Sequence, residues 1–355
     1  MEIQELLEQT NKRGASDLHL MAGYQPTLRI DGELTPIRDK PVLSSQETER
    51  LVFSILTSEQ KELFLANKEL DFSFAFSEAR FRVNVYFQQG EIAVALRLIP
   101  FKIRTIDELN LPPICHTFAS LRQGFILVTG PTGHGKSTTL AAIINEINQN
   151  RPCHIVTIED PIEYVYPRGQ AIISQREMHL DTHSWEVALR SCLREDPDVV
   201  LVGEMRDYET IAAALTIAET GHLVFATLHT NSAAQTVDRI VDVFPEHAKS
   251  QVRAQFSATL EGILSERLVP AIEGGRIPAC EILVTTPAVR TTIREGKTHL
   301  IDNIIQTSGG LGMISLEGIL ARLVKTGKIT TSVAEDFALR PEELERLLRG
   351  RKGSP

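Results

Sequence analysis

A glycine-rich segment near the middle of the chain has the residue types and spacing of a phosphate-binding loop. Its residues are Gly130, Pro131, Thr132, Gly133, His134, Gly135, Lys136 and Ser137, followed by Thr138. Such glycines let backbone N–H groups turn toward phosphate oxygens, and a following helix adds the positive end of its dipole. The pattern predicts that this segment binds ATP, with Lys136 reaching the β- and γ-phosphates and Ser137 binding Mg²⁺. Residues 125–129 before it predict a strand, and residues 137–148 predict a helix.

A second apolar stretch downstream ends in a carboxylate. Residues 198–202 run into Gly203 and Glu204. A buried strand that ends in an acid, downstream of such a loop, is typical of a Walker B strand. A carboxylate at that edge can polarise the water that attacks the γ-phosphate. Glu204 is therefore the predicted catalytic base. Gly203 stands where an Asp usually holds Mg²⁺, which leaves the metal short of one protein carboxylate.

The best replacement for that carboxylate lies in the acidic segment after residues 155–158. Glu159, Asp160 and Glu163 leave the same predicted strand. Three acids this close repel one another unless a cation or an arginine meets them. Glu163 is the first choice for binding Mg²⁺, directly or through a water, and Glu159 is the second. A solvated acidic loop is the alternative.

Two histidines flank the predicted buried strand at residues 223–228. His229 closes the strand, where its ring could sense the γ-phosphate by hydrogen bonding, and it is a candidate catalytic residue. His222 precedes the strand and is better explained as a turn residue.

The first hundred residues have a different pattern. Residues 2–13 place apolar side chains on one helical face, Asp31-Gly32 predicts a tight hairpin turn, and Ser44 with Glu47 forms a capping box before a helix. Three stretches of alternating polarity follow, at 70–76, 80–88 and 91–99. The pattern predicts an antiparallel α+β domain over residues 1–100.

The pattern changes after a proline-containing segment, residues 101–113, which predicts an interdomain linker. Short apolar strands then alternate with helical stretches, at 125–129, 154–158, 199–202 and 223–228. This alternation is typical of a mostly parallel sheet. The predicted fold class is α/β, with an ATPase domain over residues 114–349 and a disordered tail at residues 350–355.

Bulk properties exclude several classes of protein. The net charge of −9 argues against a surface that coats nucleic acid. The four cysteines lie far apart without a Cys-x-x-Cys pair, which argues against a disulfide framework or a zinc site. The N-terminus is acidic and polar, unlike a signal peptide, and no apolar run approaches the roughly 18 residues that span a bilayer. We expect a cytoplasmic protein whose membrane contact runs through a partner.

These motifs together resemble those of the secretion-type hexameric ATPases, and within them the type IV pilus retraction ATPases. The resemblance covers nearly the whole chain and includes residues 15–19, 130–137, 159–163, 193–198, 203–207 and 222–229. The Gly203-Glu204 pair is itself usual in that family. The resemblance implies a PAS-like N-terminal domain, a RecA-like P-loop domain, and a homohexamer that uses ATP and Mg²⁺. It also implies an inner-membrane pilus platform protein as partner, pilin as an indirect partner, and no nucleic acid.

Two features favour a retraction motor over an extension motor. Extension and secretion relatives usually carry a four-cysteine zinc insertion, which these scattered cysteines cannot build. Residues 288–295, Ala-Val-Arg-Thr-Thr-Ile-Arg-Glu, are similar to the retraction signature Ala-Ile-Arg-Asn-Leu-Ile-Arg-Glu, with Thr286 and Pro287 suited to start that helix. The chain departs from the family at positions 289, 291 and 292, and at His134, where Ser is usual.

The family places arginines from a neighbouring subunit near the nucleotide, and two arginines here fit that arrangement. If residues 89–90 form a two-residue turn, Arg82 lies opposite Arg97 on the face away from the core. Like charges directly opposed on a sheet are destabilising. A neighbour's ATP or acidic segment would remove the penalty. Arginines exposed to water, or paired with acids of their own domain, are the alternative.

Three other functions remain open. Another secretion or pilus motor of the same fold shares every motif. A RecA-like DNA translocase is disfavoured by the net charge and by the absence of a basic tract. A nucleotide-gated scaffold that does not hydrolyse ATP is disfavoured by the intact Lys136 and Glu204.

Overall fold

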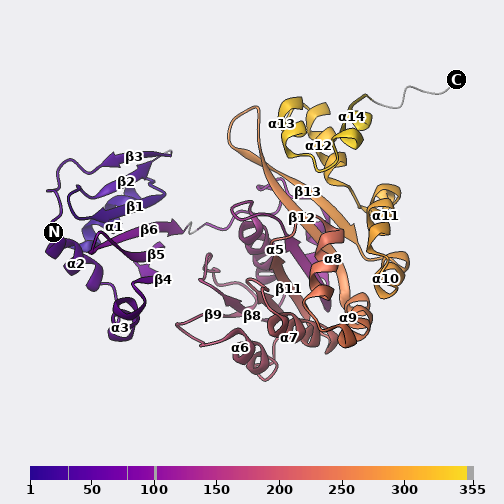
Figure 1. Ribbon diagram of the computed structural model, residues 1–355, viewed down its shortest axis with the longest axis horizontal. Helices are drawn as coiled ribbons and strands as arrows, with labels where there is room; N and C mark the ends of the chain where they lie inside the picture. Colours follow the sequence, from indigo (N-terminus) through magenta and orange to yellow (C-terminus); the bar gives the residue numbers. More distant parts are fainter. Residues whose placement is uncertain (31, 78, 100–101, 350–355) are drawn as a thin grey trace. The chain divides into compact units, whose positions relative to one another are not determined.

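The computed structural model describes residues 1–30, 32–77, 79–99 and 102–349. Asp31 of the predicted turn and the predicted tail at residues 350–355 lie outside these residues. The chain divides into two compact units (Figure 1). The first is Met1–Lys102 with the short segment Pro161–Val165, and the second is Ile103–Asp160 with the chain from Tyr166 onward.

The first unit is a six-stranded antiparallel sheet with three helices. The strands lie in the order β3-β2-β1-β6-β5-β4. Their bounds are β1 (Asp17–Met21), β2 (Thr27–Ile30), β3 (Glu33–Pro36), β4 (Glu69–Phe76), β5 (Ala79–Gln88) and β6 (Glu91–Ile99). The helices are α1 (Ile3–Lys12), α2 (Ser45–Phe53) and α3 (Ser58–Asn67). The predicted capping box of Ser44 and Glu47 opens α2 and is confirmed.

The hairpin β5–β6 has the register that its sequence predicts. Gln89 and Gly90 both have positive φ, 50° and 83°, as a two-residue turn of type I′ requires. The register then places Arg82 opposite Arg97. Alternate residues of β5, such as Phe81 and Val83, are fully buried in the core of this unit. The two-residue turn sets this register, and the alternating polarity agrees with it, because a slip by one residue would expose the apolar face.

The second unit is built on a seven-stranded, mostly parallel sheet. The strand order is β13-β12-β7-β11-β10-β8-β9, and only the pairing of β12 with β13 is antiparallel. The bounds are β7 (Gly124–Thr129), β8 (His154–Glu159), β9 (Ile172–Glu177), β10 (Val199–Val202), β11 (Leu223–Leu228), β12 (Leu260–Pro270) and β13 (Arg276–Val284). The predicted mostly parallel sheet is confirmed. Three of its strands, β9, β12 and β13, were not predicted.

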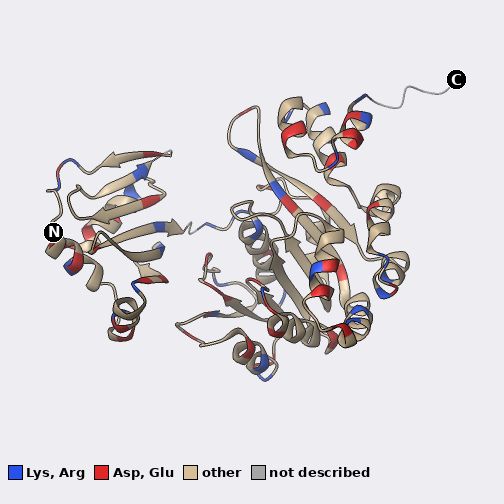
Figure 2. Ribbon diagram, in the orientation of Figure 1, with Lys and Arg blue, Asp and Glu red and all other residues tan. Residues whose placement is uncertain are grey.

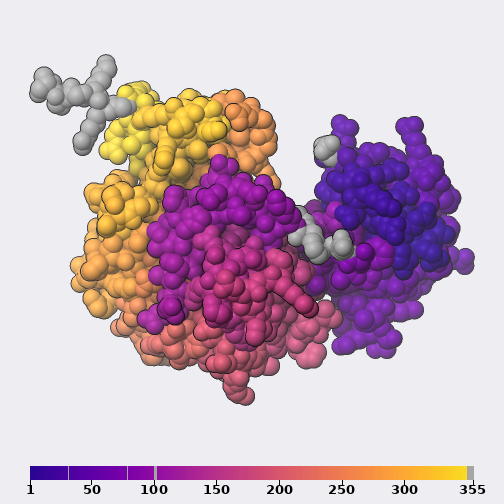
Figure 3. Space-filling model, turned by 180° about the vertical axis from the view of Figure 1, so that it is seen from behind, coloured from indigo at the N-terminus to yellow at the C-terminus, as the bar shows by residue number. Residues whose placement is uncertain are grey.

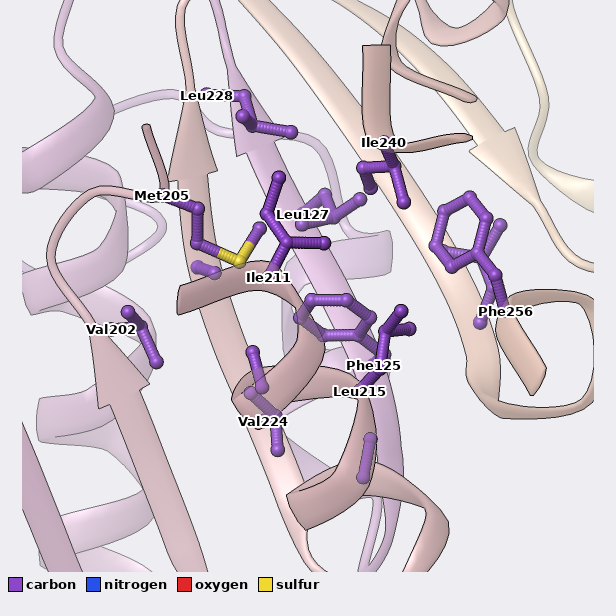
Figure 4. Close-up of a cluster of buried hydrophobic side chains, with 14 of the residues drawn as sticks. Phe125, Leu127, Val202, Met205, Ile211, Leu215, Val224, Leu228, Ile240 and Phe256 are labelled. Carbon is purple, nitrogen blue, oxygen red and sulfur yellow. The ribbon is translucent and has the colours of Figure 1, made fainter. Parts of the chain in front are cut away.

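Helices cover both faces of this sheet. Their bounds are α4 (Ile114–Ser120), α5 (Lys136–Asn150), α6 (Trp185–Cys192), α7 (Tyr208–Glu219), α8 (Ala233–Asp242), α9 (Glu246–Thr259), α10 (Pro287–Arg294), α11 (Ile301–Thr307), α12 (Leu316–Lys325), α13 (Thr331–Phe337) and α14 (Pro341–Arg349), with short 3₁₀ turns at Thr298–Leu300 and Gly309–Leu311. The side chains of β7 alternate between two cores. Ile126 and Val128 pack toward α4 and α5, whereas Phe125 and Leu127 belong to the core formed with α7, α8 and α9 (Figure 4).

The segment after residue 103 packs into the second unit. Ile106 and Leu111, which belong to the predicted linker, are buried in the same core as α4 and α5. On one face of the unit this segment (magenta) adjoins the C-terminal helices (yellow) in Figure 3. Asp107 and Ile114 line one groove together with Leu347 of α14.

Charged residues are distributed over both units. Figure 2 shows acidic and basic residues interspersed along the helices and strands of each unit. None of the helices in the described ranges combines the length and apolarity needed to cross a membrane.

Candidate active site

The predicted phosphate-binding loop connects the end of β7 to the start of α5. Gly130, Gly133 and Gly135 have positive φ of 143°, 77° and 99°. A Cβ atom at Gly130 would lie 2.2 Å from the backbone oxygen of Glu266, and one at Gly135 would lie 2.5 Å from a carboxylate oxygen of the same residue. A Cβ at Gly133 would meet nothing within 4 Å. The loop thus presses against β12 on one side and has open space at Gly133, as a cradle for phosphates requires.

Lys136 begins α5 and turns back over the loop. Its side chain is buried, and its Nζ atom donates to the carbonyl oxygens of Gly130 at 2.9 Å and Pro131 at 3.0 Å. Ser137 and Thr138 follow in the first turn of α5, where both residues are half-buried. The free N–H groups at this helix start and the Lys136 ammonium provide the positive potential that a phosphate needs.

His134, the unusual residue of the loop, attaches it to the elements beside it. Its Nδ1 atom accepts a hydrogen bond from the Leu268 N–H of β12 at 3.0 Å. Its ring meets the Phe337 ring of α13 edge-on, with centroids 6.5 Å apart. Burial, together with the positive charges of Arg267, Arg276 and Lys136, lowers the pKa of the His134 imidazole. The neutral ring is therefore favoured, and only a neutral ring can accept the Leu268 N–H at Nδ1.

The structure brings Glu204, His229 and Lys136 together. Glu204 follows β10, and its Oε1 atom lies 2.9 Å from Nε2 of His229 at the end of β11. The Nδ1 atom of His229 lies 3.4 Å from Nζ of Lys136 and also 3.4 Å from the Thr132 hydroxyl. The predicted base and the predicted phosphate-binding lysine therefore meet the same imidazole ring from opposite sides.

Arg206 holds the Glu204 carboxylate in place. Its Nε and Nη2 atoms reach the two carboxylate oxygens at 2.7 and 2.8 Å. Burial by itself raises the pKa of Glu204, but Arg206 and His229 more than offset it and hold that pKa below its ordinary value. Glu204 is thus a carboxylate at neutral pH, as a base must be. Met205 between them points into the core beneath the sheet and anchors this turn (Figure 4).

There is little space for a side chain at position 203. A Cβ atom there would lie 3.2 Å from both the Cα of Glu159 and the carbonyl oxygen of Ile158. A Walker B aspartate at this position would therefore push against β8. The absence of a side chain at Gly203 therefore suits the close approach of the chain after β10 to β8.

The three acids at the end of β8 and just after it have different surroundings. Glu159 is buried and accepts hydrogen bonds from the Thr157 hydroxyl at 2.7 Å and the Gln175 amide at 3.2 Å, which ties β8 to β9. Asp160 lies close enough to act electrostatically on Arg206. Glu163 belongs to the segment Pro161–Val165 that groups with the first unit, so its role at the metal stays a prediction.

The residues present fit Mg²⁺ bound mainly through nucleotide and water. No group of three or more His, Cys, Asp or Glu side chains that could hold a metal occurs in the part of the chain that the structure describes. Mg²⁺ commonly keeps several waters and binds one or two protein groups together with phosphates. The Ser137 hydroxyl at the start of α5 suits such a site.

Arg82 and Arg97 do lie opposite each other, but each has an acidic partner in its own unit. The guanidinium of Arg82 makes three hydrogen bonds to the Asp71 carboxylate of β4, the shortest at 2.6 Å. Nε of Arg97 donates to Asp17 of β1 at 2.9 Å. Of the two explanations that the sequence left open for their repulsion, this pairing corresponds to the alternative, in which acids of their own domain offset it. Arg97 still exposes 72% of its side chain, and a role in trans stays a prediction for both arginines.

Two residues of the site were not assigned a role from the sequence. Arg206 lies two positions after Glu204. This proximity in sequence, just past the end of a strand, could have indicated that Arg206 pairs with the Glu204 carboxylate. Glu266 lies in β12, beneath the loop, and accepts a hydrogen bond from the Thr139 hydroxyl at 2.7 Å. Nothing in its local sequence pointed to the loop, which is more than a hundred residues away.

Comparisons with known proteins identify the family of this chain. Residues 1–281 match the family described as type II/IV secretion system protein. The chain belongs to this family. Among its relatives, the type IV pilus retraction ATPase PilT of Pseudomonas aeruginosa is 48% identical over 96% of this chain and 99% of its own length. A twitching motility protein of Neisseria gonorrhoeae is 47% identical over 90% of this chain and 86% of its own length.

A solved structure extends the similarity to the fold. The crystal structure of the pilus retraction motor PilT with bound ADP superposes with a TM-score of 0.91, at 45% identity, and covers 97% of this chain and 99% of that one. The resemblance to the retraction ATPases of the type II/IV secretion family is confirmed, and so is the α/β fold with an N-terminal α+β unit and a RecA-like ATPase unit. The chain is a nucleotide-binding P-loop ATPase of this family.

Proposed function

We propose that this chain is the motor that hydrolyses ATP to drive type IV pilus retraction, and hence pilus disassembly and twitching motility. The end-to-end similarity to the pilus retraction ATPase PilT carries the proposal, because the match extends through both units and leaves no large part of the relative uncovered. The joint placement of Lys136, His229 and Glu204 supports it chemically, since a motor needs a site that hydrolyses and not only one that binds.

The residues divide the work between binding and hydrolysis. Residues 130–138 bind the phosphates, with the Lys136 ammonium on the β- and γ-phosphates. Glu204 orients and deprotonates the attacking water, and Arg206 keeps it ionised. His229 donates a hydrogen bond to Glu204 or to the phosphates, according to which nucleotide is bound. Mg²⁺, bound by Ser137 and by Glu163 directly or through water, would neutralise charge on the phosphates.

The motor is proposed to be a homohexamer of two-domain subunits. The proposed division is an N-terminal PAS-like domain at residues 1–100, a linker at 101–113, the RecA-like ATPase domain at 114–349 and a tail at 350–355. Arg82 and Arg97 would reach a neighbour's nucleotide and stabilise charge on the transferred phosphoryl group, as arginines supplied in trans do. Their acidic partners, Asp71 and Asp17, lie on the same sheet and hold the guanidinium groups in defined positions.

The partners follow from the proposed function. An inner-membrane pilus platform protein would transmit the domain motions to the pilus base, so that pilin is contacted only indirectly. The chain would then work in the cytoplasm, at the inner membrane through that partner. Interspersed charges of both signs (Figure 2) and a net charge of −9 support a protein partner over nucleic acid.

The helix that resembles the retraction signature supports retraction over extension. Thr286 caps α10, and Pro287 lies in its first turn, as the sequence predicts. Arg290 donates to the carbonyl oxygens of Ser257 and Ala258 and pairs with Glu261 at 2.8 Å. These carbonyls belong to the end of α9, where a positive charge is favourable. Arg290 therefore fixes the position of α10, and Arg294 at its last turn is exposed.

The direct test combines genetics with enzymology. Cells that lack the gene should keep their pili but lose twitching motility, and the wild-type gene should restore it whereas the Glu204→Gln gene should not. The purified protein should hydrolyse ATP at a rate that DNA does not change. Twitching that survives deletion of the gene would contradict the proposal, and hydrolysis that requires DNA would favour a translocase.

A further inference from the structure

A buried carboxyl group lies directly beneath the phosphate-binding loop and is unused by the reaction as described. Glu266 of β12 is only 2% exposed. Its Oε2 atom accepts a hydrogen bond from Thr139, a buried residue in the first turn of α5. Its other carboxylate oxygen packs against Gly135, and its backbone oxygen packs against Gly130. Both ends of the loop and the helix after it are therefore in contact with this one residue.

Few charged groups face the Glu266 carboxyl. Lys136 of α5 is the positive charge that acts on it. Cys115 of α4 and Cys280 of β13 face it from the other elements, and burial raises the pKa of both thiols, to about 12 for Cys115 and well above the ordinary value for Cys280. The two thiols therefore carry no charge at neutral pH. Burial raises the pKa of Glu266 to about 7, although the Thr139 hydrogen bond and Lys136 oppose that rise.

We propose that Glu266 is a positioning residue of the nucleotide site and takes up a proton when nucleotide phosphates bind, so that the loop binds nucleotide more tightly when this carboxyl is protonated. This inference rests on the proposed function, because it concerns the same nucleotide site.

The argument is electrostatic. Bound phosphates share the Lys136 charge and bring further negative charge to the loop. An ionised Glu266 would then lose the compensation of its cation and be repelled by the phosphates through a medium that screens little. The protonated carboxyl avoids both costs and keeps its contacts with Gly135 and Thr139. The proton comes from solvent, and no bond other than O–H forms or breaks.

The sign of the pH dependence follows from linkage. Nucleotide binding raises the pKa of Glu266, so the affinity is highest at pH values below the pKa of the nucleotide-free protein. The affinity falls as the pH rises through that value and levels off above the pKa of the complex. A rise of about one pKa unit on binding corresponds to about a tenfold change in affinity.

ADP binding to the purified full-length protein tests this proposal. The ADP affinity would be measured calorimetrically from pH 6 to 8.5, in pairs of buffers with different ionisation enthalpies, to count protons taken up. Wild-type protein should lose about tenfold more affinity across this range than Glu266→Gln, which keeps the shape and removes the charge. Titration of ADP itself occurs in both proteins and cancels in the comparison.

A matched control is available in the neighbouring strand. Glu281 of β13 is equally buried, and burial raises its pKa to about 7, but it accepts the Ala233 N–H of α8 instead of contacting the loop. Glu281→Gln should keep the wild-type pH dependence. The proposal would be overturned if Glu266→Gln kept the wild-type pH dependence of ADP affinity and the wild-type number of protons taken up. It would also be overturned if Glu266→Gln lowered the ADP affinity equally at every pH, because a merely structural role has that effect.

A second variant leaves the carboxyl in place. The Thr139 hydrogen bond lowers the pKa of Glu266, so Thr139→Val should move the fall in ADP affinity to higher pH. An unmoved transition would contradict the proposal even if Glu266→Gln failed to fold. Absence of ADP binding by the wild-type protein would instead contradict the proposed function, so the two failures are distinguishable.

Discussion

The imidazole of His229 bridges Glu204 and Lys136. Its Nε2 atom lies 2.9 Å from the Glu204 carboxylate, and its Nδ1 atom lies 3.4 Å from the Lys136 ammonium. Glu204 follows β10 and Lys136 begins α5, and the His229 ring, which directly follows β11, connects them. A change in the phosphates bound near Lys136 can therefore alter the surroundings of Glu204 through the His229 side chain alone.

Arg206→Ala should shift the pH dependence of ATP hydrolysis. Arg206 lowers the pKa of Glu204, so its removal raises that pKa, and a larger fraction of the base is protonated at mildly acidic pH. The acidic limb of the kcat profile should move to higher pH, and the rate at alkaline pH should change little. Arg190→Ala, which removes an exposed pair with Glu186, is the control. If the acidic limb of the kcat profile lies at the same pH in Arg206→Ala as in the wild type, Arg206 does not lower the pKa of the catalytic base.

Substitution by alanine should lower the free energy of unfolding by different amounts at two glycines of the loop. Gly133→Ala should lower the free energy of unfolding by about 1–2 kcal/mol, because only the positive φ is unfavourable. Gly130→Ala adds a collision with the Glu266 carbonyl oxygen and should cost about 1–3 kcal/mol more. Urea titration followed by the fluorescence of Trp185, the single tryptophan of the chain, measures the stability of the second unit. Equal costs would contradict the close packing of the loop on β12.

Glu163→Gln should weaken Mg²⁺-dependent hydrolysis more than nucleotide binding. Gly203 offers the metal no carboxylate, so the loss of Glu163 would raise the Mg²⁺ concentration needed for half-maximal turnover. Titration of ATPase activity with Mg²⁺ at saturating ATP measures this. Glu33→Gln, at an exposed position of β3, is the control. Wild-type Mg²⁺ dependence in Glu163→Gln would favour the alternative of a solvated acidic loop.

The elements that the sequence predicted well are those with uninterrupted patterns. Buried and less buried residues alternate along most of β5, and β7, β10 and β11 are short apolar runs that are buried throughout. The strand β12 escaped prediction because the buried Glu266 and the adjacent Arg267 interrupt its apolar pattern. A local pattern cannot show that a carboxyl in the middle of a strand is accommodated by a loop more than a hundred residues away.

The residues of the candidate site likewise show that a local sequence pattern does not reveal contacts with distant residues. Lys136 and Ser137 belong to a contiguous motif, and Glu204 and His229 end recognisable strands, so each could be named from the sequence. Arg206, which holds the Glu204 carboxylate, is close to it in sequence, but other partners of the site residues are distant in sequence. Asp17, which pairs with Arg97, is 80 residues away in sequence, and sequence spacing carries no information about such a contact.

Arg97→Ala tests whether the active site is shared between subunits. The variant should fold and bind ATP but lose ATPase activity, because Arg97 would act on a neighbour's nucleotide. Mixed with Lys136→Ala subunits, it should recover activity at interfaces that pair an intact loop with an intact arginine. Arg29→Ala, which removes the other arginine near Asp17, at 3.9 Å, is the control. No recovery, despite demonstrated mixing of subunits, would contradict an arginine supplied in trans.

The central claim is that the chain hydrolyses ATP with Glu204 as the base, and the turnover of Glu204→Gln measured beside its ATP affinity tests it most directly. Glutamine keeps the size of the side chain and its contact with His229 but cannot accept a proton. Turnover should fall by at least about a hundredfold, the usual contribution of a general base, while the ATP affinity stays within about threefold of wild type. Wild-type turnover in Glu204→Gln would contradict the account.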